Sequence, residues 1–199
     1  MKKIPTLFKR EFKDHKVVNV LPEVTDGLEW VLSNPYVCGT VKFDGSCCAV
    51  INGEFYKRYD AKNGKQVPEG AIKCQEAPDP ITGHMPCWVK CDRDNPSDVW
   101  LWKAYDLFIA FNVLREGTYE AVGKHFNGNP YNLSFDRLAR HGALSIAEHL
   151  LSPDVVLSYL NIKDWLREHE VEGIVFWKQG EPICKIKRSD FGFEWPIRR

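Results

Sequence analysis

Alternating apolar and polar residues predict a pair of strands early in the chain. Residues 36–51 and 54–59 are rich in β-branched and aromatic side chains, and Asn52-Gly53 stands between the two stretches. An Asn-Gly pair favours a two-residue hairpin turn, because both residues readily adopt a left-handed backbone. We therefore predict that Lys42 lies near the end of one strand and that Arg58 lies on the returning strand.

The alternation also predicts which way the side chains around Lys42 point. Successive side chains of a strand point to opposite faces, so Val41 and Phe43 should share one face and Lys42 and Asp44 the other. Gly45 should then break the strand. This places a lysine beside a carboxylate, between two apolar neighbours.

The middle of the chain carries a weaker pattern. Residues 60–98 contain five prolines among polar residues and predict a long irregular excursion, with one short strand around Trp88 and Val89. Residues 103–113 then place Tyr105, Phe108, Ile109 and Val113 at helical spacing. Residues 117–123 predict another strand.

The last quarter predicts a helix followed by two strands. Ser152, Pro153 and Asp154 resemble a helix start, with a cap, a proline at the first helical position and an acid in the first turn, so the helix should run from there to about Glu168. Residues 172–177 and 182–187 predict two strands joined by a short turn. These elements indicate an α+β fold, rich in antiparallel strands and without internal repeats.

Composition indicates one compact domain over residues 1–199. The chain is 44% hydrophobic and 13% aromatic, enough for one sizeable core. It contains no apolar run near the roughly 20 residues of a membrane span, and its start lacks the apolar stretch of a signal peptide. We expect a soluble, cytoplasmic protein without a membrane partner.

The seven cysteines favour reduced thiols over a disulfide framework, because their number is odd and the chain has many core-forming residues. A metal site built from Cys74, His84, Cys87 and Cys91 stays open as an alternative, although the spacing is not a paired Cys-x-x-Cys pattern.

Charge is balanced overall but unevenly distributed. The net charge is zero, which argues against indiscriminate binding of polyanions. Residues 1–16 contain six basic and two acidic residues, and residues 178–199 contain six basic and three acidic residues. Two basic ends are compatible with a localised nucleic-acid groove, and solvated termini would explain them equally well.

Four short stretches carry candidate chemistry in a specific order. Each is weak alone, but together, with Arg58 following the first, they are specific. They are Lys42-Phe43-Asp44-Gly45, residues 119–123 (YEAVG), residues 172–176 (EGIVF) and Lys185-Ile186-Lys187.

In this order, the stretches resemble the covalent nucleotidyltransferase superfamily, which contains ATP-dependent DNA and RNA ligases and messenger-RNA capping guanylyltransferases. Within it, the chain is most similar to the vertebrate-type 5′-to-3′ RNA ligases, the RNA ligase 1-like proteins. The stretches that carry this narrower resemblance span residues 41–197; they are VKFDGSCC, GHMPCWV, NGNPYNL, HGALSI, VEGIVFW and ICKIKRSDFGFEWPI.

The resemblance implies an antiparallel-rich nucleotidyltransferase core, that is, an ATP-grasp-like ligase adenylation domain. Only twelve residues follow Lys187, so we expect no OB domain. The implied function is an ATP-dependent RNA ligase in RNA repair. It would join RNA 5′-phosphate and 3′-hydroxyl ends through a covalent lysyl-AMP, formed by auto-AMPylation, and an adenylated RNA. We expect a monomer that uses Mg²⁺, with Mn²⁺ as an alternative.

The resemblance also implies a role for each site residue. Lys42 would attack ATP and carry AMP; as a nucleophile it must be neutral, so its site should lower its pKa by desolvation or nearby positive charge. Asp44 would either hold the lysine amine or orient metal-bound water. Glu120 would accept hydrogen bonds from the ribose, and Glu172 would bind the catalytic metal.

The remaining basic residues would contact phosphate. Lys185 and Lys187 lie two apart on a predicted strand, so both should point to one face and Cys184 and Ile186 to the other. Two ammonium groups on one face could neutralise the triphosphate and the leaving pyrophosphate. Arg58 would contact a phosphate of the nucleotide or of the RNA.

Three parts of this interpretation stay open. The walls of an adenine pocket could come from aromatic side chains at Trp102, Phe126, His141 or Phe176. Asn127, Asn129 and Tyr131 could contact nucleotide or RNA, or could build a turn. The alternatives for the whole chain are a capping-type guanylyltransferase, a DNA ligase core, or a nucleotide- or RNA-binding module without catalysis.

Overall fold

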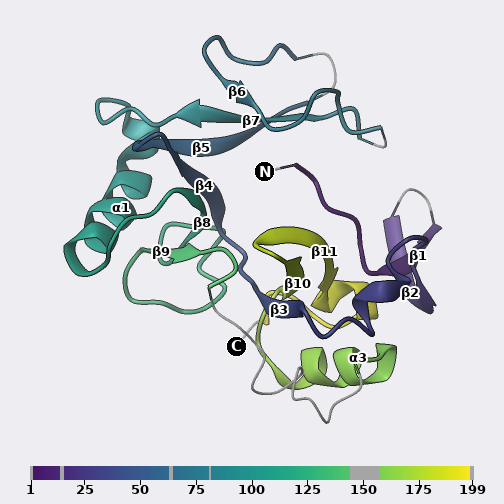
Figure 1. Ribbon diagram of the computed structural model, residues 1–199. Coiled ribbons are helices and arrows are strands. Elements are labelled where there is room, and N and C mark those ends of the chain that lie inside the picture. Colours follow the sequence, from purple (N-terminus) through teal and green to yellow (C-terminus); the bar gives the residue numbers. More distant parts are fainter. Residues whose placement is uncertain (1, 14–15, 63–64, 81, 144–156, 198–199) are drawn as a thin grey trace. The chain divides into compact units, whose positions relative to one another are not determined.

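The chain folds into two compact units (Figure 1). The computed structural model describes residues 2–13, 16–62, 65–80, 82–143 and 157–197. Unit 1 consists of Asp44–His141 with the first three residues, and unit 2 of Ile4–Phe43 and Gly142–Arg199. The boundary therefore falls between Lys42 and Asp44. The prediction of a single nucleotidyltransferase domain stays a prediction.

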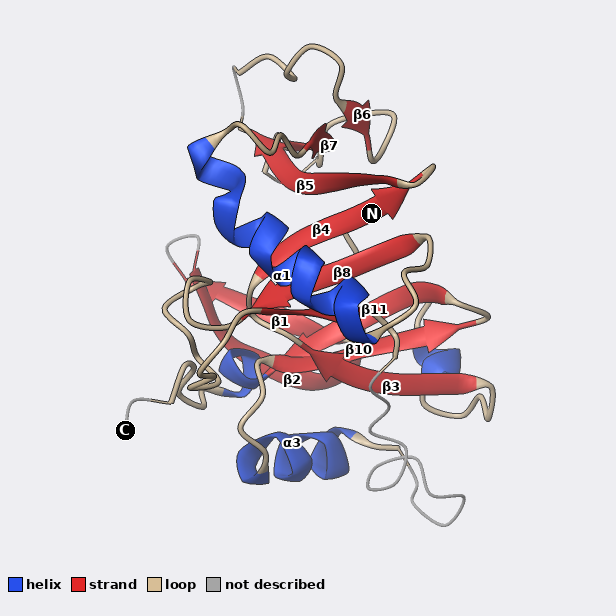
Figure 2. Cartoon of the chain, turned by 90° about the vertical axis from the view of Figure 1, so that its left-hand side faces the viewer, coloured by secondary structure: helices blue, strands red, loops and turns tan. Residues whose placement is uncertain are grey.

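Unit 1 contains a six-stranded antiparallel sheet with helix α1 across one face (Figure 2). The strand order is β6-β7-β5-β4-β8-β9. The elements are β4 (Ser46–Ile51), β5 (Glu54–Ala61), β6 (Ile72–Lys73), β7 (Met85–Lys90), a 3₁₀ turn (Pro96–Asp98), α1 (Val99–Phe111), β8 (Gly117–Val122) and β9 (Arg137–Arg140). The core lies where Leu101 and Ala104 of α1 pack on the sheet.

Unit 2 contains a three-stranded antiparallel sheet, a separate two-stranded ribbon and helix α3 (Figure 2). The three-stranded sheet has the order β11-β10-β3. The elements are β1 (Phe8–Lys13), β2 (Lys16–Val24), a 3₁₀ turn (Glu29–Val31), β3 (Val37–Lys42), α3 (Tyr159–Glu168), β10 (Gly173–Lys178), β11 (Glu181–Lys187) and a 3₁₀ turn (Arg188–Phe191). Ile162 and Leu166 of α3 pack against Ile174, Phe176 and Ile186.

Both predicted hairpins are confirmed. In the turn between β4 and β5, Asn52 and Gly53 adopt φ of 52° and 76°, and Gln179 and Gly180 adopt 52° and 82° between β10 and β11. Two successive positive φ values match the twist of the strands on either side, which is why Asn and Gly are favoured there.

The predicted break at Gly45 is confirmed, because residues 36–51 form two strands, β3 and β4, and residues 43–45 between them belong to neither strand. The predicted pairing of the Lys42 strand with the Arg58 strand is wrong. β3 pairs with β10 and β4 with β5, so Lys42 is not on the strand that pairs with that of Arg58. Lys42 nevertheless ends its strand, as predicted, with Val41 packed against the core of unit 2.

Both predicted helices form, with different bounds. α1 begins at Val99, before the predicted start, and it ends at Phe111; of the predicted apolar stripe, Ile109 is 45% exposed and Val113 80% exposed. α3 ends at Glu168 as predicted. Its cap is Ser158, whose backbone is extended, so the predicted uninterrupted helix is too long. The predicted start at residues 152–154 lies outside the described residues.

The remaining elements agree with the sequence pattern. The strand expected around Trp88 is present as β7, and the strand expected over residues 117–123 is β8. The α+β class with antiparallel sheets is confirmed. In the part of the chain that the structure describes, no helix is both long and apolar enough to cross a membrane.

Two glycines of the sequence motifs lie where a neighbouring strand comes very close. A Cβ added to Gly173 would lie 2.2 Å from the backbone oxygen of Ile186 on β11, and a Cβ added to Gly45 would lie 2.2 Å from the backbone oxygen of Ala121 on β8. No side chain fits at such distances, so each sheet requires glycine at that position.

We expect Gly173→Ala to lower the free energy of unfolding by about 1–3 kcal/mol, because the new methyl group must push β11 away from β10. Urea denaturation followed by circular dichroism measures this change. Cys38→Ala, at an exposed position of β3 in the same sheet, is the control and should stay within about 0.5 kcal/mol. Equal stability of the two variants would contradict the close approach.

Candidate functional site

Strand order in unit 2 brings three distant parts of the sequence together. β10 is the central strand, and its first residue, Gly173, is paired with Lys42 at the end of β3 and with Lys187 at the end of β11. Glu172 directly precedes β10. The carboxylate therefore lies between the ends of the two neighbouring strands, and each of those ends carries a lysine.

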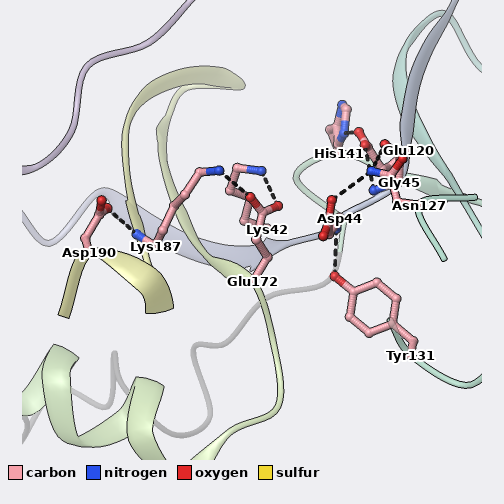
Figure 3. Close-up of polar contacts among 10 residues, drawn as sticks. All are labelled: Lys42, Asp44, Gly45, Glu120, Asn127, Tyr131, His141, Glu172, Lys187 and Asp190. Carbon is pink, nitrogen blue, oxygen red and sulfur yellow. Dashed lines mark hydrogen bonds and ion pairs between the residues drawn. The ribbon is translucent and has the colours of Figure 1, made fainter. Parts of the chain in front are cut away.

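Glu172 forms ion pairs with both lysines (Figure 3). Lys42 donates to its Oε2 atom, and the Nζ atom of Lys187 lies 2.6 Å from its Oε1 atom. The Glu172 side chain is only 7% exposed. A buried carboxylate is unstable without compensation, and these two ammonium groups supply it.

Lys185 lies one pleat before Lys187 on the same face of β11, while Cys184 and Ile186 are fully buried in the core, as predicted. Burial lowers the pKa of Lys185 to about 8, and the positive charges of Lys42, Lys187 and Arg10 add to this shift. Glu172 opposes the shift. Near neutral pH, Lys185 is therefore a cation that gives up its proton readily.

Arg10 is a member of this cluster that the sequence motifs did not identify. It lies on β1, and its guanidinium pairs with the buried carboxylate of Asp190 at 2.8 Å. The same carboxylate accepts the backbone N–H of Lys187 at 2.8 Å. The signal in the sequence was the basic excess of residues 1–16, which does not single out one residue. We call Arg10, Lys42, Lys185, Lys187 and Glu172 the lysine cluster.

Asp44 is held by a loop of unit 1 (Figure 3). Asn127 donates to the Asp44 carboxylate and to the Gly45 carbonyl oxygen, at 2.8 Å in each case. The Asp44 backbone N–H donates to the Tyr131 hydroxyl at 2.7 Å. Asn129 instead closes its own turn through two hydrogen bonds with the Leu133 backbone. Of the two roles considered for these loop residues, Asn129 has the turn-building one.

Glu120 lies on β8 with both carboxylate oxygens engaged (Figure 3). The Gly45 backbone N–H donates to its Oε1 atom at 3.1 Å, and His141 Nε2 lies 3.0 Å from its Oε2 atom. His141 Nδ1 lies 2.9 Å from the Thr118 hydroxyl. The pair formed by Glu120 and His141 is thus held in position by two further polar contacts, one to each partner.

Arg58 is placed on β5 as expected, where its guanidinium pairs with Asp60 at 2.7 Å. Its predicted contact with phosphate stays a prediction. Two of the aromatic residues considered as adenine walls, Phe126 and Phe176, are instead core residues, 5% and 0% exposed.

The alternative metal site in the middle of the chain is not supported. The Cys87 thiol donates to the Tyr59 carbonyl oxygen, and Cys91 lies in the core of unit 1. Among the described residues, Cys74, His84, Cys87 and Cys91 do not bring their ligand atoms together. These cysteines are free thiols.

Comparison with known proteins shows where this chain has relatives. The family model described as RNA ligase 1 matches residues 106–199. RNA ligase 1 of the rat, Rattus norvegicus, is 26% identical over 272 aligned residues, which cover 98% of this chain and 82% of the relative. RNA ligase 1 of the zebrafish, Danio rerio, is 28% identical over 226 residues, covering 79% of this chain and 68% of the relative.

RNA ligase 1 of the mouse, Mus musculus, is 26% identical over 274 residues, again covering 98% of this chain and 82% of the relative. The matches take in the sequence of both units, and they confirm the resemblance predicted from the short motifs. By its sequence, this chain resembles the RNA ligase 1 proteins along nearly its whole length.

Proposed function

We propose that this protein is an ATP-dependent RNA ligase that joins an RNA 5′-phosphate to an RNA 3′-hydroxyl. The observation that carries the proposal is the lysine cluster, in which Lys42 and Lys187 share the buried carboxylate of Glu172. The relatives named RNA ligase 1 support the same function independently of this geometry.

In the first step, Lys42 Nζ forms a bond to the α-phosphorus of ATP. The bond from that phosphorus to the bridging oxygen breaks, and its electron pair leaves with pyrophosphate. Lys42 loses two protons in all, one when its ammonium group becomes the neutral nucleophile and one when the N–P bond forms. Both pass to solvent, the first by way of the Glu172 oxygen that accepts the hydrogen bond of Lys42, so Glu172 is ionised again afterwards. The product is a phosphoramidate between Lys42 and AMP.

In the later steps, AMP passes from Lys42 to the RNA 5′-phosphate, which frees the lysine. The RNA 3′-hydroxyl then attacks that phosphate, forms the phosphodiester and releases AMP. The enzyme is regenerated, so the overall reaction consumes one ATP for each bond formed.

The other cations of the lysine cluster suit the negative charge of the leaving pyrophosphate. Lys185 and Lys187 lie on one face, and Arg10 is near enough to affect the pKa of Lys185. Positive groups that are already in position stabilise developing charge without reorganising. Lys185 should become fully charged when an anion binds beside it, because the anion counteracts the neighbouring cations.

Glu172 suits a magnesium ion. Each of its oxygens contacts one lysine, and an ionised carboxylate offers about four lone-pair sites, so capacity remains for a cation. One carboxylate together with substrate phosphates and water is a usual way to bind Mg²⁺, and Mn²⁺ accepts similar ligands. A bound metal would withdraw charge from the phosphates.

The roles proposed in unit 1 rest on the resemblance. Glu120 would accept hydrogen bonds from the ribose hydroxyls, and Arg58 would contact phosphate. Asp44 would act through its carboxylate, whose position Asn127 fixes.

We expect the purified protein, incubated with α-labelled ATP and Mg²⁺ and then denatured, to keep the label. Lys42→Ala should abolish the labelling, because it removes the nucleophile. The variant should still fold, since Glu172 keeps its contact with Lys187; circular dichroism checks this. Lys178→Ala, at the other end of β10, is the matched control and should label normally.

The same experiment separates the alternatives. Label from GTP alone would favour a capping guanylyltransferase. Absence of label from either nucleotide in folded protein would contradict the covalent mechanism and favour a binding module. If ATP labels Lys42, joining of 5′-phosphorylated RNA compared with matched DNA distinguishes an RNA ligase from a DNA ligase.

The pKa of Lys185 predicts how pyrophosphate binding depends on pH. With a pKa of about 8, the fraction of charged Lys185 falls from about nine-tenths at pH 7 to about one-tenth at pH 9. Pyrophosphate binds the charged form better, so the affinity of the wild type relative to Lys185→Met should fall by up to about tenfold over this range.

Isothermal titration calorimetry at pH 7, 8 and 9 measures the two affinities. The ratio cancels the titration of pyrophosphate itself, because both proteins meet the same ligand. A ratio that stays constant with pH would show that Lys185 does not contribute a titrating charge to the anion site.

A further inference from the structure

Three potential metal ligands of different chemistry converge in unit 1. Cys47, Glu120 and His141 each offer one ligand atom, and these atoms all lie within 4.8 Å of one another. Cys47 is on β4, Glu120 on β8, and His141 directly follows β9. These strands are neighbours in the sheet, in the order β4-β8-β9.

Sheet register explains why the three side chains meet. Cys47 lies opposite Glu120 on β8, and Glu120 lies opposite Ala139 on β9. His141 is two residues beyond Ala139, and its backbone N–H continues the ladder by donating to the Thr118 carbonyl oxygen at 3.0 Å. Residues opposite each other, or two apart along a strand, point to the same face of a sheet.

Two contacts around the cluster would hold its ligands in orientation. The Gly45 N–H occupies Glu120 Oε1, which leaves Oε2 toward His141. The Thr118 hydroxyl lies against His141 Nδ1, which leaves Nε2 toward Glu120. A metal-binding histidine commonly donates its other ring N–H to a fixed acceptor in this way.

The spacing suits a tetrahedral ion. Ligand bonds of about 2.0–2.3 Å in a tetrahedron separate the ligand atoms by roughly 3.3–3.8 Å. When the ion binds, the 3.0 Å distance between Glu120 Oε2 and His141 Nε2 would increase slightly. The distances from Cys47 Sγ to these two atoms would decrease by about 1 Å or less.

We propose that Cys47, Glu120 and His141 form a zinc site with three protein ligands and an open fourth position. Sulfur, imidazole nitrogen and carboxylate oxygen are all usual zinc ligands, whereas Mg²⁺ prefers oxygen alone. The site is distinct from Glu172, which belongs to unit 2, but it shares Glu120 with the proposed ribose contact, so zinc and the ribose would compete for that carboxylate. Zinc would link three adjacent strands and so stabilise unit 1.

Binding must release the proton of the Cys47 thiol. Burial, followed by the nearby Glu120 charge, raises the pKa of this thiol to about 12. The metal-free site therefore holds a neutral thiol, and Zn²⁺ replaces its proton to form a zinc thiolate while one proton passes to solvent.

Cobalt titration of the reduced, metal-free full chain tests the proposal. Co²⁺ replaces Zn²⁺ in such sites and reports its ligands in its absorption spectrum. We expect one equivalent of Co²⁺ to give a thiolate-to-cobalt charge-transfer band and the strong visible bands of tetrahedral cobalt, with one equivalent of Zn²⁺ abolishing both. An excess of Mg²⁺ should leave them unchanged.

Variants identify the ligands. Cys47→Ser should abolish the charge-transfer band, and His141→Gln should weaken Co²⁺ binding at least tenfold. Thr118→Val should keep the spectrum and weaken binding about 10–100-fold, because it removes only the partner of the histidine. Cys38→Ser, in unit 2, is the control and should match the wild type.

Stability gives a second measurement that needs no nucleotide. Zn²⁺ should raise the melting temperature of the wild type and of Cys38→Ser but not that of Cys47→Ser, because a ligand stabilises only the state that binds it. A charge-transfer band that persists in Cys47→Ser, absence of the band in the wild type, or an equal zinc-induced shift in all three proteins would overturn the site. Because the test uses metal and protein alone, its outcome is independent of adenylation.

Discussion

The arrangement of unit 2 depends on the buried carboxylate of Glu172. A charge at 7% exposure is costly unless it is paired, and here each oxygen contacts the ammonium group of a different strand. This requires β10 to lie between β3 and β11, with the ends of all three strands level. The same carboxylate also offsets part of the repulsion that acts on Lys185. The order of the strands and the charge balance of the cluster therefore depend on the same contacts of Glu172.

The motif glycines have a related structural reason. Gly173 follows the carboxylate of Glu172, and Gly45 follows that of Asp44. Each lies against the backbone of a neighbouring strand, at a distance that excludes any side chain. Gly45 also gives its N–H to Glu120. A glycine beside an acidic residue in these motifs thus lets two backbones approach closely enough to fix where the carboxylate points.

Local features were predictable from the sequence, and pairings between distant segments were not. Asn52-Gly53 and the short turn at residues 178–181 predict the two hairpins, and the alternation around Lys185 predicts the face of the lysine pair, because in each case the information lies within a few residues. The pairing of β3 with β10 leaves no trace in local periodicity, so the contact between Lys42 and Glu172 could not be derived that way. The resemblance alone assigned both residues to a site.

The helix errors have physical causes as well. α1 begins early because Asn95 caps a 3₁₀ turn that leads into it, with Pro96 in the first turn, a start signal that the apolar spacing did not include. Arg10 was missed because a basic excess near one end does not show which side chain finds a buried carboxylate. The contact of His141 with Glu120 joins two strands and likewise has no local signature.

The division of the chain also has a consequence for folding during synthesis. Unit 1 is almost wholly one continuous segment, whereas unit 2 is assembled from segments on either side of it. The partners in the contact between Lys42 and Glu172 are 130 residues apart in sequence. When β3 emerges from the ribosome, its partner strand β10 has not yet been made, so the edge of β3 stays unpaired until the later segment of unit 2 follows. Contacts of such long range form slowly, and unpaired strand edges are prone to aggregate. The lysine cluster therefore cannot assemble until β10 and β11 have been made, long after β3.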